Sequence, residues 1–114
     1  MSFVLSTFDA NGEYKPVDIY VGSGYSVRVV LGWTYCVAGG QTFLSTDLDL
    51  GLRDKSNGQT VDSSSSYTNS LEMLEYTNTG AGRTFTVVIK KWGNMQSCLG
   101  VQREYAGLSW AVRY

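Results

Sequence analysis

The side chains that could do chemistry are four oxygen donors in the middle of the chain: Asp47, Asp49, Asn69 and Glu72. Carboxylate and amide oxygens are the ligands that Ca²⁺ takes, about six to eight at a time. If strand 46–54 and segment 66–72 are neighbours, the donors meet, and the sequence predicts a calcium site. The alternative is structural, with Asp49 and Glu72 accepting hydrogen bonds that fix loops at the end of a sheet.

Catalysis has much weaker support. Asp47 and Asp49, two residues apart on one strand face, would lie about 7 Å from each other, within the spacing of glycosidase carboxylates. However, the chain has no histidine, which removes Ser–His and Cys–His nucleophiles and most zinc sites. No nucleophile elbow, phosphate loop or dinucleotide fingerprint occurs either. We therefore expect no enzyme activity and no required cofactor, with calcium as the one candidate ion.

Aromatic residues are the other candidate ligands, since the chain has three tryptophans and eight tyrosines. Exposed rings stack on sugars while their polar tips bind hydroxyls. Tyr35, Trp92 and Tyr105 lie at predicted loops or strand ends, and we expect these rings to be partly exposed. Trp110 alternates in phase with Leu108, so we expect it in the core. The alternative is that all these rings belong to the core and its rim.

Cys36 and Cys98 fit no metal-ligand spacing. Both fall in predicted loops, and in an exported protein they could pair. A disulfide closing a loop of about 60 residues would stabilise the fold by about 4 kcal/mol. The alternative is two buried free thiols, each acting as a small apolar side chain.

The elements that must position these residues are strands. No helical periodicity is present. Short runs rich in Val, Ile, Thr, Tyr and Phe recur at about ten-residue spacing, separated by Gly, Asn, Ser and Asp. Turns are expected at Asn11-Gly12 and at 55–58, loops at 34–45 and 93–104, and a β-bulge near Met73-Leu74. The predicted strands are 2–8, 14–21, 25–33, 46–54, 60–69 (a short edge strand and loop), 71–78, 84–92 and 108–114.

These strands predict a single all-β domain over residues 1–114. In strand 46–54 three leucines alternate with polar residues, which is typical of a half-buried strand in an antiparallel two-sheet sandwich. The net charge is −1 with no basic cluster, so we expect no nucleic-acid partner. No apolar run is long enough to span a membrane. Met1 directly precedes a strand without a signal peptide, and we expect a domain taken from a longer secreted protein.

Several segments, taken in chain order, resemble a known family. They are Gly24–Thr34, Thr46–Leu50, Asn57-Gly58, Ser66–Glu72, Gly82–Ile89 and Gly107–Ala111. Together they resemble the bacterial pre-peptidase C-terminal, or P-domain-like, jelly-roll domain found after secreted subtilisin-like proteases. The match runs from about Val17 to Arg113. Thr46 stands where the family often has Asn, and Thr68 where it often has Asp.

The resemblance implies an antiparallel jelly-roll β-sandwich of about eight strands. It implies a non-catalytic accessory domain of a secreted protease or other exported enzyme that aids folding, stability or engagement of a substrate or surface. The expected partners are the catalytic domain of the same precursor and a protein or polysaccharide substrate, and the expected location is secreted or cell-surface. Some related domains bind calcium. The alternative function is a carbohydrate- or matrix-binding module, stabilised by calcium.

Overall fold

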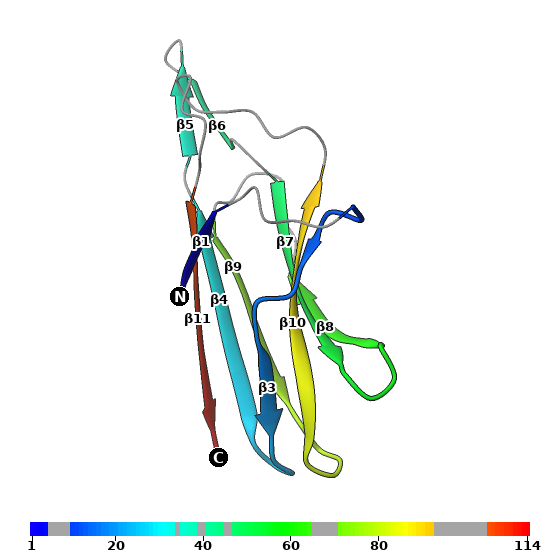
Figure 1. The fold of residues 1–114 in the computed structure, drawn as a ribbon. Coiled ribbons are helices and arrows are strands. Elements are labelled where there is room, and N and C mark those ends of the chain that lie inside the picture. Colours follow the sequence, from blue (N-terminus) through cyan, green and yellow to red (C-terminus); the bar gives the residue numbers. More distant parts are fainter. Residues whose placement is uncertain (5–9, 34, 39–40, 45–46, 65–70, 93–104) are drawn as a thin grey trace.

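Strands account for all the regular structure in the described part of the chain, which contains no helix (Figure 1). The computed structural model describes residues 1–4, 10–33, 35–38, 41–44, 47–64, 71–92 and 105–114, and only the backbone of residues 2–4, 35–38, 41–44, 47, 91–92 and 105. The strands are β1 (Ser2–Val4), β2 (Glu13–Tyr14), β3 (Asp18–Val21), β4 (Ser26–Trp33), β5 (Tyr35–Ala38), β6 (Gln41–Leu44), β7 (Asp47–Asp54), β8 (Thr60–Ser64), β9 (Leu71–Thr77), β10 (Arg83–Trp92) and β11 (Tyr105–Arg113).

The strands form two antiparallel sheets that face each other. The four-stranded sheet has the order β1-β11-β4-β9, and the five-stranded sheet has the order β2-β10-β7-β8, with β3 also pairing with β10. The hairpin β5–β6 pairs only with itself and projects beyond the ends of both sheets (Figure 1). If β2 and β3 are counted as one interrupted strand and the hairpin β5–β6 is left out, eight strands remain. Renumbered from 1 to 8 along the chain, these strands have the order 1-8-3-6 in one sheet and 2-7-4-5 in the other. This order is that of a jelly roll, so the predicted fold is confirmed.

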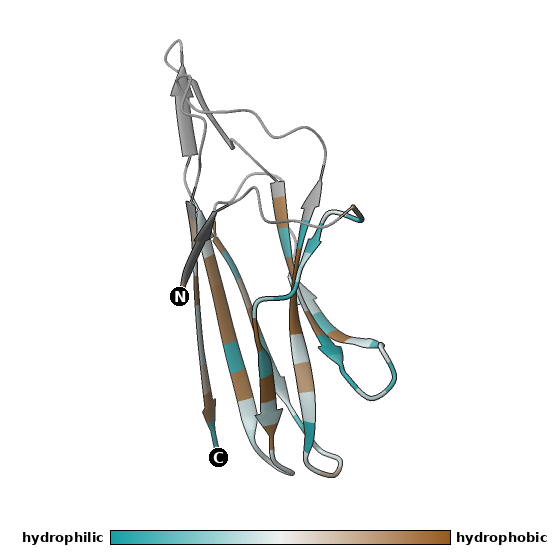
Figure 2. Cartoon of the chain, viewed as in Figure 1, coloured by the Kyte–Doolittle hydropathy of each residue, from teal (hydrophilic) through white to brown (hydrophobic). Residues whose placement is uncertain are grey.

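The core lies between the sheets and follows strict alternation along the long strands. Figure 2 shows the corresponding bands of apolar and polar residues along β4 and β10. In β7 the three predicted leucines are fully buried, and the residues between them are partly exposed. Apolar burial of this kind is the main driving force for the sandwich. The fully buried set is Val21, Val27, Val29, Leu31, Leu48, Leu50, Leu52, Phe85, Val87 and Ile89.

The interruption between β2 and β3 is a one-residue bulge at Pro16. Tyr14 pairs with Ile89 and Asp18 with Thr86, so four steps along one strand match three along β10. Proline has no N–H for the ladder and is tolerated at edges and bulges. The carbonyl of Val17 still accepts a hydrogen bond from the N–H of Val87 at 3.0 Å. The turns at Asn11-Gly12 and 55–58 are confirmed, with φ of 75° at Gly12 and 74° at Gly58.

Two predictions about the four-stranded sheet and its neighbours are wrong. Segment 34–45 contains the hairpin β5–β6 instead of a loop. Strand β9 pairs with β4 in unbroken register, so the bulge near Met73-Leu74 does not exist. Such a bulge would turn every apolar residue of this strand inward. Instead Glu72 is buried, whereas Leu71 and Met73 point outward and are 58% and 55% exposed.

The last strand also differs from expectation. Leu108 is buried as predicted, but Trp110 is 39% exposed and is not a core residue. Its register places it beside Val29, which is fully buried, so Trp110 lies on the inner face of the four-stranded sheet. Alternation correctly predicts the face of the sheet. It cannot show whether the opposite sheet extends far enough to cover that face.

Candidate functional site

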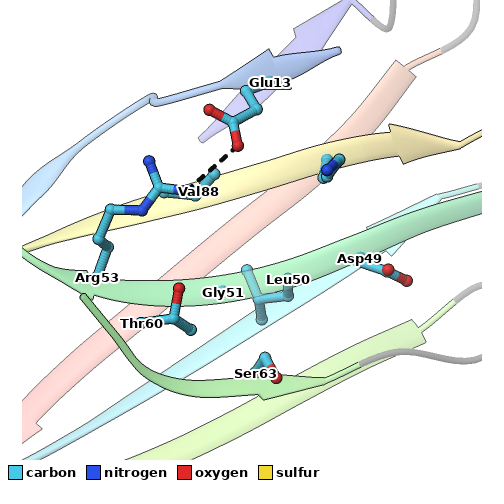
Figure 3. Close-up of a pocket in the computed structure, with 9 residues that line it drawn as sticks. Glu13, Asp49, Leu50, Gly51, Arg53, Thr60, Ser63 and Val88 are labelled. Atoms are coloured by element: carbon cyan, nitrogen blue, oxygen red, sulfur yellow. Dashed lines mark hydrogen bonds and ion pairs between the residues drawn. The ribbon is translucent and has the colours of Figure 1, made fainter. Parts of the chain in front are cut away.

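A polar pocket lies on the outer face of the five-stranded sheet (Figure 3). Its volume is about 290 Å³. Strands β2, β7, β8 and β10 all contribute to it, so it lies over the outer face of the sheet. The lining residues are Glu13, Asp49, Leu50, Gly51, Arg53, Thr60, Ser63, Val88 and Lys90.

Strand register brings these residues together in rows. Residues directly opposite each other in an antiparallel sheet point to the same face, about 5 Å apart. Lys90 pairs with Glu13 on one side and with Asp49 on the other, which makes a row of alternating charge. In the next row Gly51 lies between Val88 and Ser63.

The hollow is centred on Gly51, the one residue of its row without a side chain. A Cβ atom built there would meet only the carbonyl oxygen of Val88, at 3.8 Å, which is ordinary contact. The side chain of Val88 is also buried, but it does not belong to the core between the two sheets. The residues on either side of Val88 in β10 do belong to that core. The pocket therefore has a small apolar floor at Val88 and Gly51, with polar walls around it.

The charges around the pocket balance one another. The Arg53 guanidinium forms an ion pair with Glu13 at 3.2 Å, and the Lys15 ammonium lies 4.0 Å from the same carboxylate. One row further along the sheet, Lys55 contacts Asp18 at 2.6 Å and the Thr86 hydroxyl donates to Asp18 at 2.8 Å. These hydrogen bonds, that from Lys55 first, lower the pKa of Asp18 below its ordinary value. Acidic and basic side chains on this face are thus nearly equal in number.

This composition selects among ligand classes. A phosphate would face two carboxylates, and a metal ion would face Arg53 and Lys90, so both would meet like charge. An apolar ligand would desolvate charged groups without pairing them. A ligand with many hydroxyl groups fits better. Its hydroxyls can donate hydrogen bonds to the carboxylates of Glu13 and Asp49 and accept them from Arg53 and Lys90. With the hydroxyls of Thr60 and Ser63 they can both donate and accept.

Of the four predicted calcium ligands, the structure describes the side chains of only two, and these do not meet. Asp49 lines the outer pocket. Glu72 is 3% exposed in the other sheet, where it accepts a hydrogen bond from the Ser64 hydroxyl across the β8–β9 edge. The side chain of Asp47 and all of Asn69 lie outside the described residues. Within the part of the chain that the structure describes, no three acidic or cysteine side chains cluster as metal ligands.

The other predicted site residues are placed by their backbone alone. Tyr35 and Cys36 belong to β5, not to a loop, and Trp92 and Tyr105 lie in β10 and β11. Trp92 pairs with Asp47, two residues beyond the charged row. Their side chains lie outside the described residues, as does all of Cys98. The exposed rings and the Cys36–Cys98 disulfide stay predictions.

Of the residues that line the pocket, only Asp49 is predicted from the sequence as a candidate ligand. Glu13, Arg53, Thr60, Ser63 and Lys90 come from four strands, of which only β7 and β8 are close together in the sequence. The one available signal was Gly51, a glycine inside an otherwise regular strand, which often marks a close approach or a hollow.

A second group of polar residues joins the ends of the strands and has a structural role. The Arg83 guanidinium contacts the buried carboxylate of Asp54 at 2.9 Å. The Ser56 hydroxyl and N–H donate to the same carboxylate at 2.7 and 2.9 Å. These contacts, those from Ser56 first, lower the pKa of Asp54. The fully buried Asn78 lies beside Arg83, and its side-chain oxygen accepts a hydrogen bond from the turn that follows β9.

Comparison with known proteins adds no family assignment. No helix of the described residues has the length and apolar character needed to cross a membrane. The resemblance to the pre-peptidase C-terminal domain stays a prediction from the motifs. No protein-family model matches the chain, and no curated protein matches it.

Proposed function

We propose that this chain is a non-catalytic binding module that holds a saccharide in the pocket around Gly51. The observation that supports this function most directly is the pocket itself, a hollow of about 290 Å³ on the outer sheet face, walled by both hydrogen-bond donors and acceptors. Sugar hydroxyls need both kinds of partner at once. The apolar floor suits the C–H face of a sugar ring.

The setting we propose is an exported enzyme, in which the module engages a substrate or surface for a catalytic domain. The support for this setting is the ordered motif resemblance, and a jelly roll is compatible with it without requiring it. The reading frame of the parent protein tests the setting separately. An upstream domain with catalytic Asp, His and Ser would support a peptidase as the parent enzyme. A glycosidase domain would contradict the peptidase setting and would leave the proposal of saccharide binding standing.

The test of the pocket is a single substitution that fills it. Gly51→Thr adds a strand-favouring side chain where the space allows it, so stability should stay equal or rise by up to about 1 kcal/mol. On a glycan array, the wild-type chain should bind a subset of glycans and Gly51→Thr should lose them. Trp92→Ala, in the same strand as Lys90, measures whether that ring adds to the binding.

The matched control is Gly107→Thr, the same change in a strand of the other sheet. A Cβ atom at Gly107 would meet nothing within 4 Å, so fold and binding should both survive. If no glycan binds, or if Gly51→Thr binds as the wild type does, the pocket is not the saccharide site.

A further inference from the structure

Tyr20 presents an exposed aromatic ring on the same sheet face as the Gly51 pocket. In β3, Ile19 and Val21 point into the core, so Tyr20 between them points outward, and it is 66% exposed. Strand β3 pairs with β10, which also lines the pocket, so the ring and the pocket share one outer face. An exposed ring beside a candidate sugar pocket is a candidate second contact for the same ligand.

The ring of Tyr20 lies along the sheet face instead of standing away from it. A Cβ atom built on Gly82 would lie 2.1 Å from the Tyr20 hydroxyl oxygen and 2.9 Å from the ring carbon that carries it. The tip of the ring therefore occupies the space above Gly82 that another side chain would fill. This placement requires glycine at position 82, and it holds an aromatic ring where a sugar ring can stack on it.

Strand register gives the separation between the ring and the pocket. Tyr20 pairs with Thr84 of β10, and Gly51 pairs with Val88 of the same strand. Thr84 and Val88 are four residues apart, which is about 13 Å along the strand. Since β10 lies between β3 and β7, Tyr20 and Gly51 are also two strand spacings, about 10 Å, apart across the sheet. This separation exceeds the size of one sugar ring, so a ligand that reaches both must be an oligosaccharide or a longer chain.

A salt bridge crosses β10 between the pocket and the Tyr20 ring. The N–H of Lys55 bonds to the carbonyl of Thr84 at 3.1 Å, so Lys55 continues β7 along one side of β10. Its ammonium contacts Asp18 of β3, on the other side of β10, at 2.6 Å. The Thr86 hydroxyl donates to the same carboxylate at 2.8 Å. The surface between the two sites therefore consists of lysine methylenes and of polar groups that already bind one another.

The charges along this path favour an uncharged ligand. Lys55 and Asp18 pair with each other, and Arg53 pairs with Glu13 at 3.2 Å. A sugar carboxylate or sulfate on the path would compete with the protein carboxylates for these cations, and an amino sugar would compete with the cations for the carboxylates. Neutral hydroxyls can bond to both members of each pair without separating them.

We propose that the outer face of the five-stranded sheet binds a stretch of a neutral polysaccharide that enters the Gly51 pocket and stacks on Tyr20. The inference rests on the proposed saccharide function and extends it from one pocket to a continuous site that runs obliquely across β7, β10 and β3. Between the two ends, hydroxyls of the ligand bond to the groups around Lys55 and Asp18. Tyr20 is then the residue that makes the affinity depend on the length of the ligand.

The test is calorimetric titration of the full chain with neutral cello-, xylo- and N-acetylchito-oligosaccharides, and with acidic oligogalacturonides, each from disaccharide to hexasaccharide. In the wild type, a neutral series should bind more tightly as its length increases. Tyr20→Ala should raise the dissociation constant of the hexasaccharide at least about fivefold and leave that of the disaccharide nearly unchanged. Tyr20→Phe keeps the ring and should bind as the wild type does. Gly82→Ala keeps the tyrosine but displaces its ring, so it should act as Tyr20→Ala does.

Met73→Ala is the matched control, since Met73 is an exposed residue on the outer face of the other sheet, and it should bind every probe as the wild type does. Wild-type affinity that does not rise with length would overturn the inference but not the pocket. So would a Tyr20→Ala or Gly82→Ala chain that binds the hexasaccharide as the wild type does, or tighter binding of the acidic series than of every neutral one. If no probe binds, or if Gly51→Thr binds the disaccharide as the wild type does, the proposed function itself fails and the inference fails with it.

Discussion

Asn78 offers the sharpest test of how the two sheets are tied together. It follows β9 in the four-stranded sheet and is fully buried. Its side-chain N–H groups donate to the carbonyl of Val21, at the end of β3 in the other sheet, at 3.0 Å, and to the carbonyl of Ala81 at 2.9 Å. Its side-chain oxygen accepts from the N–H of Gly80 at 3.2 Å. One amide thus joins both sheets and the turn that leads into β10.

Asn78→Ala removes these side-chain bonds but keeps the two backbone bonds of residue 78, to Gly24 and Tyr25. Each net hydrogen bond contributes about 1 kcal/mol, and a buried carbonyl left without its donor costs about 1–3 kcal/mol. The free energy of unfolding should therefore fall by about 2–4 kcal/mol. With a urea m-value of about 2 kcal/mol/M, the unfolding midpoint should fall by about 1–2 M.

The control is Thr77→Ala, one residue earlier. The hydroxyls of Thr77 and Ser26 share a hydrogen bond of 2.7 Å, but the pair is exposed, so the midpoint should move by less than about 0.3 M. Asn78→Asp tests whether the side chain of residue 78 must donate these bonds. An ionised carboxylate can only accept hydrogen bonds, so it would place an oxygen against the two carbonyls that the amide N–H groups now bind. It should destabilise the fold, and lowering the pH should relieve part of that effect. A midpoint shift below about 0.5 M for Asn78→Ala would refute this account of the sheet connection.

Three further predictions concern protons, calcium and thiols. The pKa of Asp54 in the folded chain lies below its ordinary value of 3.8, so its stabilising contribution is complete above about pH 4 and is lost as the pH falls through the folded pKa. Asp18 changes in the same direction. The melting temperature should therefore drop less between pH 7 and pH 3 in Asp54→Asn than in the wild type, and an equal drop would contradict the linkage. A calcium ion bound only by the folded chain would raise the melting temperature. Because Asp49 and Glu72 do not meet, we expect the same melting temperature in excess calcium and in chelator. For Cys36 and Cys98, the intact mass should rise by two hydrogen atoms on reduction, and an unchanged mass would exclude the disulfide.

Alternation predicted the strands well because each long strand has one buried face. The strand order was predictable only through the motif resemblance, because hydrophobic period carries no information about which strands pair. The pocket was not predictable for the same reason. Its charged row depends on Glu13 meeting Lys90, and that pairing depends on the extra residue at Pro16. Shifting the register by one would turn Glu13 to the other face.

The failures in β9 and β11 share a physical cause. Apolar residues were expected to point inward, yet Glu72 takes an inward position because the Ser64 hydroxyl meets it there across the sandwich edge. Asn78 makes a second polar link between the sheets at one end of the sandwich. Along β11 beyond Leu108 the structure describes no comparable link, and there Trp110 and Val112 are left half exposed. Polar bonds thus join the sheets where the sandwich is closed, and apolar side chains line the edge where it stays open.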